Sequence, residues 1–401
     1  MPLLPVFDFA TAQRILFGAG VFDQVGKLAA EQGRHVFLVA GPSAFADGGP
    51  AGRLTAQLAA LGVRLTTFTV IGEPEVTSVT AATDAARQAG ADVVVGLGGG
   101  SALDMGKAVA GLLTNGGEPL DYMEVVGRGK AITQPAAPYM AVATTAGPGA
   151  EVTRNAVVLS RAHGVKASIR SPYLLPRLAV VDPLLPHSLP PDATAATGLD
   201  ALTQLIEPYV SRRANPLTDA LILSALPRGA TALPRAWTTP DDAEARADMA
   251  FASLCGGLAL ANAGLGAVHG FAAPLGGAYP IPHGVACALL LAPVMEANVA
   301  ALRAMEPDAT AGPATAGATL RRYVEVGGML TGEWGADAIE AGVDWVRDRV
   351  KQFGLGGLTR YGVRADDLPD LAQRAEEASS MKGNPVTLDR ATLLRMLKRA
   401  L

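Results

Sequence analysis

The stretch that decides the fold of the first half of this chain is VVVGLGGGSALDMGKAVAGLL, residues 93–113. The valine run predicts a buried strand, and the segment from Ser101 onward has the composition of a helix. The turn between them consists largely of glycine, whose backbone N–H groups can approach a ligand closely. A helix N-terminus adds partial positive charge, so this turn predicts a site for phosphate or pyrophosphate. A glycine-rich turn without a ligand is the alternative.

This loop differs from both common nucleotide-binding motifs. It follows the third or fourth predicted strand, and its glycines do not keep the spacing G-x-G-x-x-G. Lys107 lies on the helix without a following Ser or Thr, which excludes a P-loop. We expect Ser101 to cap the helix, with Asp104 in the reciprocal position of a capping box. The segment TTAGPGAEVTRN, residues 144–155, offers hydroxyls and glycines to the same nucleotide, a plain turn being the alternative.

Strand-like and helix-like segments alternate through the first half of the chain. The predicted strands are His35–Ala40, Val63–Val70, Ala91–Gly98 and Tyr139–Thr145. This alternation predicts an α/β domain, residues 1–187, with a parallel sheet covered by helices on both faces and doubly wound. A proline-rich linker, residues 182–192, separates it from an all-helical domain, residues 188–401. The helices predicted there are Ala193–Tyr209, Pro216–Ala230, Asp242–Ala263, Gly284–Ala301, Ala336–Phe353 and one from Leu388.

Composition narrows the class of protein. The 401 residues are 49% hydrophobic with a net charge of −4 and no basic run, so nucleic acid is not an expected partner. The two cysteines, Cys255 and Cys287, do not make a disulfide framework, which favours a reducing compartment. The first residues lack a signal-peptide pattern, and the apolar stretches are expected to be too short to span a bilayer. We therefore expect a cytoplasmic protein without a membrane partner.

The histidines suggest a metal site. The chain has five, and His269 and His283 are fourteen residues apart. We expect His269 at the end of one helix and His283 at the start of the next, so that their imidazoles can meet. Asp200 and Gln204 lie one turn apart on the helix expected for TGLDALTQLIEPYVS, residues 197–211. Two imidazoles and a carboxylate suit Fe²⁺ or Zn²⁺. The alternative is a solvated helix face and two histidines satisfied near turns.

Several of these motifs, in this order, resemble those of the iron-containing (group III) alcohol dehydrogenases. GGGSALDMGK is similar to the family's G-G-G-S-x-x-D-x-A-K, and TTAGPGAEVT to T-T-A-G-T-G-S-E-V-T. TGLDALTQLIEPYVS resembles G-M-D-A-L-T-H-A-I-E-A-Y-V-S, and NAGLGAVHG, PHGVACALLLAPVMEAN and GNPVTL resemble later segments. The resemblance covers nearly the whole chain. It implies a dehydroquinate synthase-like dinucleotide domain, a helical domain, a divalent metal in the cleft between them, and a homodimer.

The resemblance also implies roles for individual residues. Asp200, His269 and His283 match three of the family's four metal ligands and are the expected catalytic residues. The residues that match the family's NAD(P)(H) contacts are Gly98, Gly99, Gly100, Ser101, Asp104, Thr144, Thr145, Thr153 and Lys166.

Three positions depart from the family pattern. Gln204 stands where the family has its second histidine ligand, and its amide oxygen is a neutral, poorer ligand. Ala273 replaces a histidine near the substrate, so the proton is expected from water or from the cofactor's ribose hydroxyl. Gly41 replaces an aspartate that would hold a ribose 2′-hydroxyl and repel a 2′-phosphate. The cofactor could therefore be NADP(H), with Arg34 or Ser43 helping to hold it.

The sequence thus predicts a metal-assisted, NAD(P)-dependent oxidoreductase that interconverts an alcohol and an aldehyde or ketone by hydride transfer. One alternative is a maleylacetate-reductase-like enzyme that reduces a carboxylated substrate without a tightly bound metal. Such an enzyme would place arginines at its substrate, and the candidates are Arg154, Arg170, Arg212 and Arg213. A dehydroquinate-synthase-like or glycerol-phosphate-dehydrogenase-like enzyme and an inactive nucleotide-binding protein are the remaining alternatives.

Overall fold

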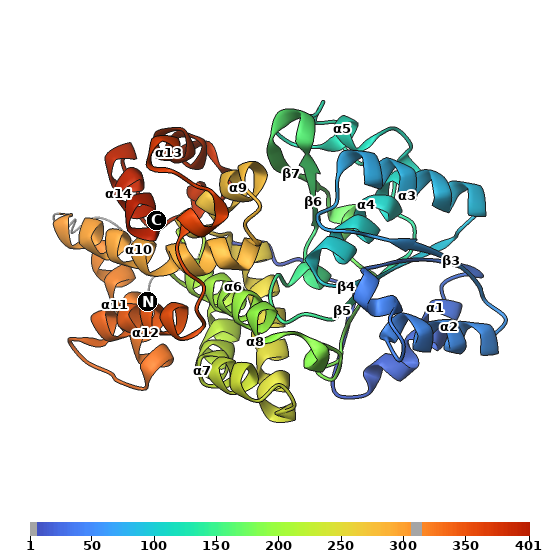
Figure 1. Ribbon diagram of the computed structural model, residues 1–401, viewed down its shortest axis with the longest axis horizontal. Coiled ribbons are helices and arrows are strands. Elements are labelled where there is room, and N and C mark those ends of the chain that lie inside the picture. Colours follow the sequence, from blue (N-terminus) through green and yellow to red (C-terminus); the bar gives the residue numbers. More distant parts are fainter. Residues whose placement is uncertain (1–5, 306–314) are drawn as a thin grey trace. The chain divides into compact units, whose positions relative to one another are not determined.

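The computed structural model describes residues 6–305 and 315–401 (Figure 1). The chain forms two compact units: Ala10–Ser188 is one, and Leu189–Leu401 with residues 6–9 is the other. The first is built on a parallel sheet and the second is helical. The fold class predicted from the sequence is therefore confirmed.

A six-stranded sheet forms the centre of the first unit. Its strands lie in the order β1-β8-β5-β4-β2-β3, and every neighbouring pair is parallel. All the strands predicted from the sequence are present, and the glycine loop follows β4, the fourth strand along the chain. The bounds are β1 Arg14–Phe17, β2 His35–Ala40, β3 Arg64–Thr69, β4 Val93–Gly98, β5 Tyr139–Ala143 and β8 Leu178–Val181.

Helices cover both faces of this sheet, because its buried strands are apolar on both sides. Along β2, Phe37 and Val39 pack with α3 (Val76–Ala89) and α4 (Gly100–Asn115). The alternate residues of β2 pack with α1 (Val25–Ala30) and α2 (Pro50–Ala60) on the other face. The predicted two-sided cover of the sheet is confirmed.

Four strands were not predicted from the sequence. β1 and β8 have four residues each, too few to show a periodic pattern. β6 (Asn155–Ser160) and β7 (Val165–Arg170) form a separate antiparallel pair. Gly164, just before β7, has a φ of +59°, a conformation that glycine adopts without strain. This unit also contains a short helix, α5 (Pro119–Tyr122), and several 3-10 turns.

The second unit consists of helices throughout the part of it that the structure describes. Three of them, α9, α11 and α13, were not predicted. The helices are α6 Pro191–Val210, α7 Pro216–Thr238, α8 Ala243–Ala263, α9 Ala267–Ala278, α10 His283–Ala304, α11 Ala316–Thr331, α12 Ala338–Gln352, α13 Leu368–Glu377 and α14 Arg390–Ala400. Helix α6 packs against α7, α8 and α10, and nearly all of it is buried. Polar groups on α6 must therefore find partners inside the protein.

Two expectations about the helices need correction. The chain bends by 100° between α8 and α9, and Gly264 at this break has a φ of +73°. His269 therefore lies in the first turn of a new helix, not at the end of the preceding one. Helix α10 is also longer than the predicted Gly284–Ala301. It has the length and hydropathy of a membrane span, so the expectation that every apolar stretch is too short to span a bilayer is wrong. Since 72% of its most apolar stretch is buried inside the protein, α10 packs as a core helix.

Candidate metal centre and nucleotide loops

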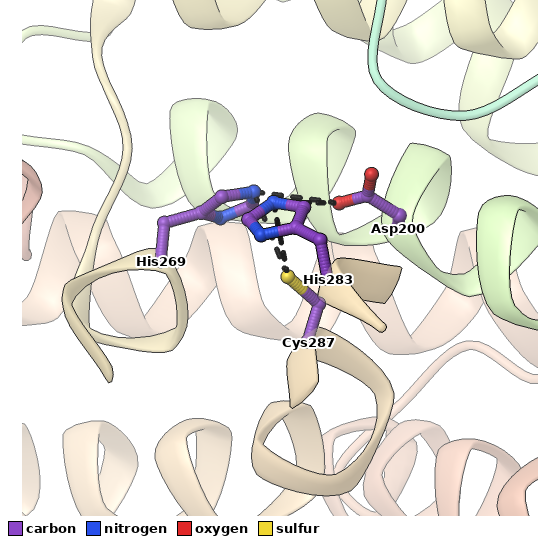
Figure 2. A group of neighbouring side chains, drawn as sticks. All are labelled: Asp200, His269, His283 and Cys287. Carbon is purple, nitrogen blue, oxygen red and sulfur yellow. Dashed lines mark hydrogen bonds and ion pairs between the residues drawn. The ribbon is translucent and has the colours of Figure 1, made fainter. Parts of the chain in front are cut away.

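Four side chains of the helical unit converge on one point (Figure 2). They are Asp200 on α6, His269 on α9, and His283 and Cys287 on α10; their ligand atoms lie within 4.8 Å of one another. Nε2 of His269 is 3.4 Å, and Nε2 of His283 3.8 Å, from the same oxygen, Oδ1 of Asp200. The structure brings together the three residues singled out in the sequence and adds a cysteine.

Local sequence explains why these elements approach so closely. His283 is the first residue of α10 and follows Pro282, which cannot continue a preceding helix. At the next residue, Gly284, a Cβ atom would lie only 2.2 Å from the carbonyl oxygen of Ala196 on α6. Glycine at this position therefore lets the start of α10 lie directly against α6. This contact carries His283 to Asp200.

The burial of Asp200 fits a bound cation. Its side chain is 2% exposed, and Oδ1 has no hydrogen-bond partner among the described residues. A buried carboxylate oxygen without a partner costs free energy unless a positive charge or a donor faces it. His283, with a side chain 40% exposed, is the most open member of the cluster. The donor set of carboxylate, two imidazoles and thiol is suited to a divalent transition metal.

The pKa directions show that this point attracts positive charge. Burial acts to raise the pKa of Asp200, but the neighbouring His283 and His269 outweigh it, and the pKa is lowered. Burial acts to lower the pKa of His269, yet Cys287, Asp200 and Glu207 raise it well above the usual value. The pKa of His283 is also raised, against the effect of burial, by Cys287 and Asp200. A divalent cation would replace these protons and be attracted by the same groups.

Glu207 is a functional candidate that the sequence analysis did not assign. Its Oε2 accepts a hydrogen bond from Nδ1 of His269 at 2.6 Å, and its Oε1 accepts one from the Val268 N–H at 2.7 Å. These bonds fix the His269 ring so that Nε2 faces the cluster. A carboxylate behind a metal-binding histidine orients the ring and raises its basicity. The signal in the sequence was position: Glu207 follows Asp200 by seven residues, two turns along the same face of α6.

Two residues that differ from the family pattern, Gln204 and Ala273, each lie one turn from a member of the cluster. Gln204 lies one turn after Asp200 on α6, and its buried Oε1 has no hydrogen-bond partner among the described residues. Ala273 lies one turn after His269 on α9, and its side chain cannot carry a proton. Asp200 and Gln204 thus present two unpartnered buried oxygens one turn apart, in keeping with a cation site.

The glycine loop has an open helix end. Helix α4 begins at Gly100 after an N-cap at Gly99, and no side chain caps it. The predicted capping box of Ser101 and Asp104 is therefore wrong. The carboxylate of Asp104 instead accepts hydrogen bonds from Nζ of Lys107 at 3.2 Å and from the N–H of Val157 at 3.1 Å. The first N–H groups of α4 remain available to an anion.

The predicted nucleotide residues from two strand ends lie together. The N–H of Thr144, after β5, donates to the carbonyl of Gly98 at the end of β4, at 3.0 Å. A Cβ atom on Gly99 would lie 3.1 Å from the side chain of Thr145. On the other side, Gly41 follows β2 in an extended conformation, and a Cβ there would meet no described atom within 4 Å. Lys166, on β7, forms an ion pair with Glu73 at 2.7 Å.

The buried side chain of Lys107, on α4 after the glycine loop, bonds to the second predicted nucleotide segment, residues 144–155. Its fully buried ammonium donates to Oγ1 of Thr153 and to the carbonyls of Ala150 and Asn155, all within 2.9 Å, besides Asp104. The Thr153 hydroxyl is therefore already engaged inside the protein. Burial lowers the pKa of Lys107 and raises that of Asp104. In the sequence, Lys107 served only to exclude a P-loop, and this role was not visible because three of its four partners lie more than forty residues away.

Comparison with known proteins identifies the family. Residues 12–183 match the family model "Iron-containing alcohol dehydrogenase", and residues 194–401 match "Fe-containing alcohol dehydrogenase family, C-terminal". The chain belongs to the iron-containing alcohol dehydrogenase family. The family resemblance inferred from the sequence motifs is confirmed, and so is the class of enzyme, an alcohol dehydrogenase-type oxidoreductase.

Individual members of the iron-containing alcohol dehydrogenase family match over almost their full length. A probable alcohol dehydrogenase, EutG, of Escherichia coli strain K12 is 34% identical over 96% of this chain and 94% of its own. The 1,3-propanediol dehydrogenase of Citrobacter freundii is 34% identical over 95% of each chain. A crystal structure of a 1,3-propanediol oxidoreductase aligns with a TM-score of 0.89 at 31% identity, over 99% of this chain and 100% of that one. Family members use NAD(H) and a divalent metal.

Proposed function

We propose that this protein interconverts an alcohol and an aldehyde or ketone by metal-assisted hydride transfer with NAD(P)(H). The observation that carries the proposal is the convergence of Asp200, His269 and His283 on one buried point, with Oδ1 of Asp200 lacking a hydrogen-bond partner among the described residues. These three residues would hold the metal, and Gln204 offers an amide oxygen one turn from Asp200. When bound, the metal supplies Lewis-acid polarisation of the substrate's oxygen.

The chain's own residues prepare this chemistry. Glu207 holds the His269 ring in one orientation, and burial keeps water away from Asp200. Ala273 offers no proton, so the reaction proceeds without a general acid at that position, a form of help typically worth about 10²–10⁴-fold. Proton delivery from water is consistent with the exposure of the cluster at His283.

For the nucleotide, we propose that Gly98, Gly99, Gly100 and Ser101 bind the pyrophosphate at the open N-terminus of α4. Thr144 and Thr145 lie beside this loop. The family resemblance supports a ribose contact by Lys166, which would have to exchange its ion pair with Glu73 for the ribose. When bound, the nicotinamide cofactor supplies or accepts the hydride. The empty space at Gly41 supports acceptance of NADP(H) as well as NAD(H).

The comparisons do not favour the maleylacetate-reductase-like alternative. The matched relatives include alcohol and propanediol dehydrogenases. Two of the arginines considered for a carboxylated substrate also have protein partners: Arg170 bonds to Glu124, and Arg212 bonds to Pro385 and Thr387. A homodimer and a cytoplasmic location stay predictions that follow from the family resemblance and from the sequence pattern.

The function is tested by following oxidation of NADH and NADPH against a panel of aldehydes and ketones. Asp200→Asn should lower turnover at least about hundredfold, because it removes the negative charge that faces the two histidines. Asp192→Asn, at the exposed start of the same helix, is the control and should leave turnover within about twofold. Unchanged turnover in Asp200→Asn would contradict the proposed site. Absence of turnover by the wild type with every substrate would favour an inactive nucleotide-binding protein.

A further inference from the structure

Cys287 belongs to the cluster by geometry. It lies one turn after His283 on α10, so both side chains project from the same face of the helix (Figure 2). Its Sγ is 3.7 Å from Nε2 of His283 and 3.8 Å from Nε2 of His269. The side chain is fully buried, so the thiol faces the cluster and not solvent.

We propose that Sγ of Cys287 is the fourth protein ligand of this metal, in place of the amide of Gln204, and that it strengthens the preference of the centre for Zn²⁺ over Fe²⁺. The inference rests on the proposed metal site and adds a ligand that the sequence resemblance does not contain.

Charge balance supports a thiolate ligand over an amide. Asp200, two neutral imidazoles and Gln204 would leave a bound divalent cation with one positive charge uncompensated among its direct ligands, because the next carboxylate, Glu207, lies behind the His269 ring. Asp200 and a Cys287 thiolate neutralise the cation, and burying an uncompensated charge is costly. Among the described residues, Asp200 has ion-pair contacts only with the two histidines, so no fixed cation already fills this role. On binding, the thiol proton is displaced by the metal and released to solvent.

The donor set also selects the metal. Thiolate is a soft ligand that favours zinc, and imidazole serves zinc and iron alike. Zinc accepts one thiolate, two imidazoles and one carboxylate, and it can expand to five ligands, which leaves a position for substrate. A neutral amide oxygen at Gln204 offers neither softness nor charge. Gln204 on α6 stands where the family has a histidine ligand, and the sulfur of Cys287, on the neighbouring helix α10, thus replaces that lost ligand.

Cys255 provides a natural control. It is the only other cysteine in the chain, lies on α8, and is buried to a similar degree. Burial raises the pKa of its thiol to about 12, and it is not part of the ligand group formed with Asp200. Any sulfur bound to the metal must come from Cys287, Cys255 or a methionine, and the two cysteine variants separate the first two sources.

The test uses the full-length protein, stripped of metal and reloaded with Zn²⁺, and the zinc X-ray absorption spectrum as readout. Wild type and Cys255→Ser should show one sulfur at about 2.3 Å besides nitrogen and oxygen at about 2.0–2.2 Å. Cys287→Ser, which keeps nearly the same volume, should lose the sulfur and bind zinc at least about tenfold more weakly in competition with a chelator. Gln204→Ala should keep the sulfur.

Loading with equal Zn²⁺ and Fe²⁺ under anaerobic conditions completes the test. Wild type and Cys255→Ser should take up zinc in large excess, and Cys287→Ser should show a clearly smaller excess, because zinc binds more tightly than Fe²⁺ at nitrogen and oxygen ligands too. Zinc bound by the wild type through nitrogen and oxygen alone would overturn the cysteine ligand and leave the proposed metal site standing. Failure of the wild type to bind either metal would overturn both proposals. If Cys287→Ser does not fold, the spectra of the wild type and Cys255→Ser still decide.

Discussion

Oε2 of Glu207 lies 2.6 Å from Nδ1 of His269, and Nε2 of the same ring lies 3.4 Å from Oδ1 of Asp200. One imidazole thus connects two carboxylates of α6 that are two turns apart. The outer carboxylate fixes the ring, and the inner one shares with it the point where a cation would bind. This arrangement gives Glu207 a positioning role that its distance from the cluster would not suggest.

Replacement of Glu207 by Gln should weaken zinc binding about 10–100-fold, because the ring loses a charged acceptor that orients it and raises its basicity. The dissociation constant for zinc is measured by competition with a chromophoric chelator. Glu325→Gln removes a carboxylate that bonds to Tyr209, away from the cluster, and is the matched control. Equal zinc affinities of Glu207→Gln and Glu325→Gln would show that the hydrogen bond to His269 has no effect on the metal.

Replacement of Lys107 by Met should destabilise the nucleotide-binding segments. The change removes the buried ammonium that pairs with Asp104 and donates to two carbonyls, and loss of one partner of a buried ion pair typically costs about 3–5 kcal/mol. Hydrogen exchange measured by mass spectrometry should show faster exchange in peptides that cover α4 and residues 150–155. Lys130→Met removes a largely exposed lysine paired with Asp121. It should change the free energy of local opening by only about 0–1 kcal/mol, and hydrogen exchange accordingly little. Equal exchange in the two variants would contradict a structural role for Lys107.

Glu151 should make the stability of the protein depend on pH. Burial raises the pKa of its carboxyl group from 4.5 to about 7, although the nearby Lys107 acts to lower it. Between these two values the folded protein binds more protons than the unfolded chain, so stability falls as pH rises through this window and then stays constant. Relative to Glu151→Gln, the wild type should be less stable by about 3 kcal/mol at pH 8.

The difference in stability between wild type and Glu151→Gln is measured by urea unfolding at pH 4 and at pH 8. It should be close to zero at pH 4, where the carboxyl group is protonated in both states, and largest at pH 8. Glu31→Gln, at an exposed position of the same unit, serves as the control. A difference that is independent of pH would contradict the raised pKa.

Gly41→Asp should shift cofactor preference from NADPH toward NADH. The backbone at Gly41 is extended and its surroundings are open, so an aspartate fits without strain. Its charge would repel a ribose 2′-phosphate, a contact between like charges that can cost several kcal/mol. The ratio of kcat/KM for NADPH to that for NADH should fall at least about tenfold, which corresponds to about 1.4 kcal/mol. Ala60→Asp, at the exposed C-terminal end of α2, is the control, and an equal shift there would show a general effect of charge.

The sequence predicted the parallel sheet well because its buried strands are continuous apolar runs, as in His35–Ala40. It did not predict β1 or β8, which are too short to carry a pattern and depend on pairing with distant strands. His269 was placed at the wrong helix end because α9, which begins at Ala267 just after the helix predicted to end at Ala263, was not predicted. Boundaries of this kind depend on packing, which local propensity does not contain.

The candidate site was also only partly predictable from the sequence. Asp200, His269 and His283 could be grouped from the sequence through their residue types and family resemblance. Cys287 was considered only as a partner for a disulfide, although its spacing of four from His283 on one helix was visible. That spacing gains meaning only once α10 is known to lie against α6, which depends on the contact between Gly284 and Ala196. The bonds of Lys107 and Glu207 likewise join residues far apart in the chain.

The most direct test of the account is the metal content of the purified protein measured together with its reduction of a carbonyl substrate by NAD(P)H. The account predicts about one divalent metal per chain. A chelator should remove metal and activity together, and added metal should restore both. Full activity in protein that holds less than about a tenth of an equivalent of metal would contradict the account.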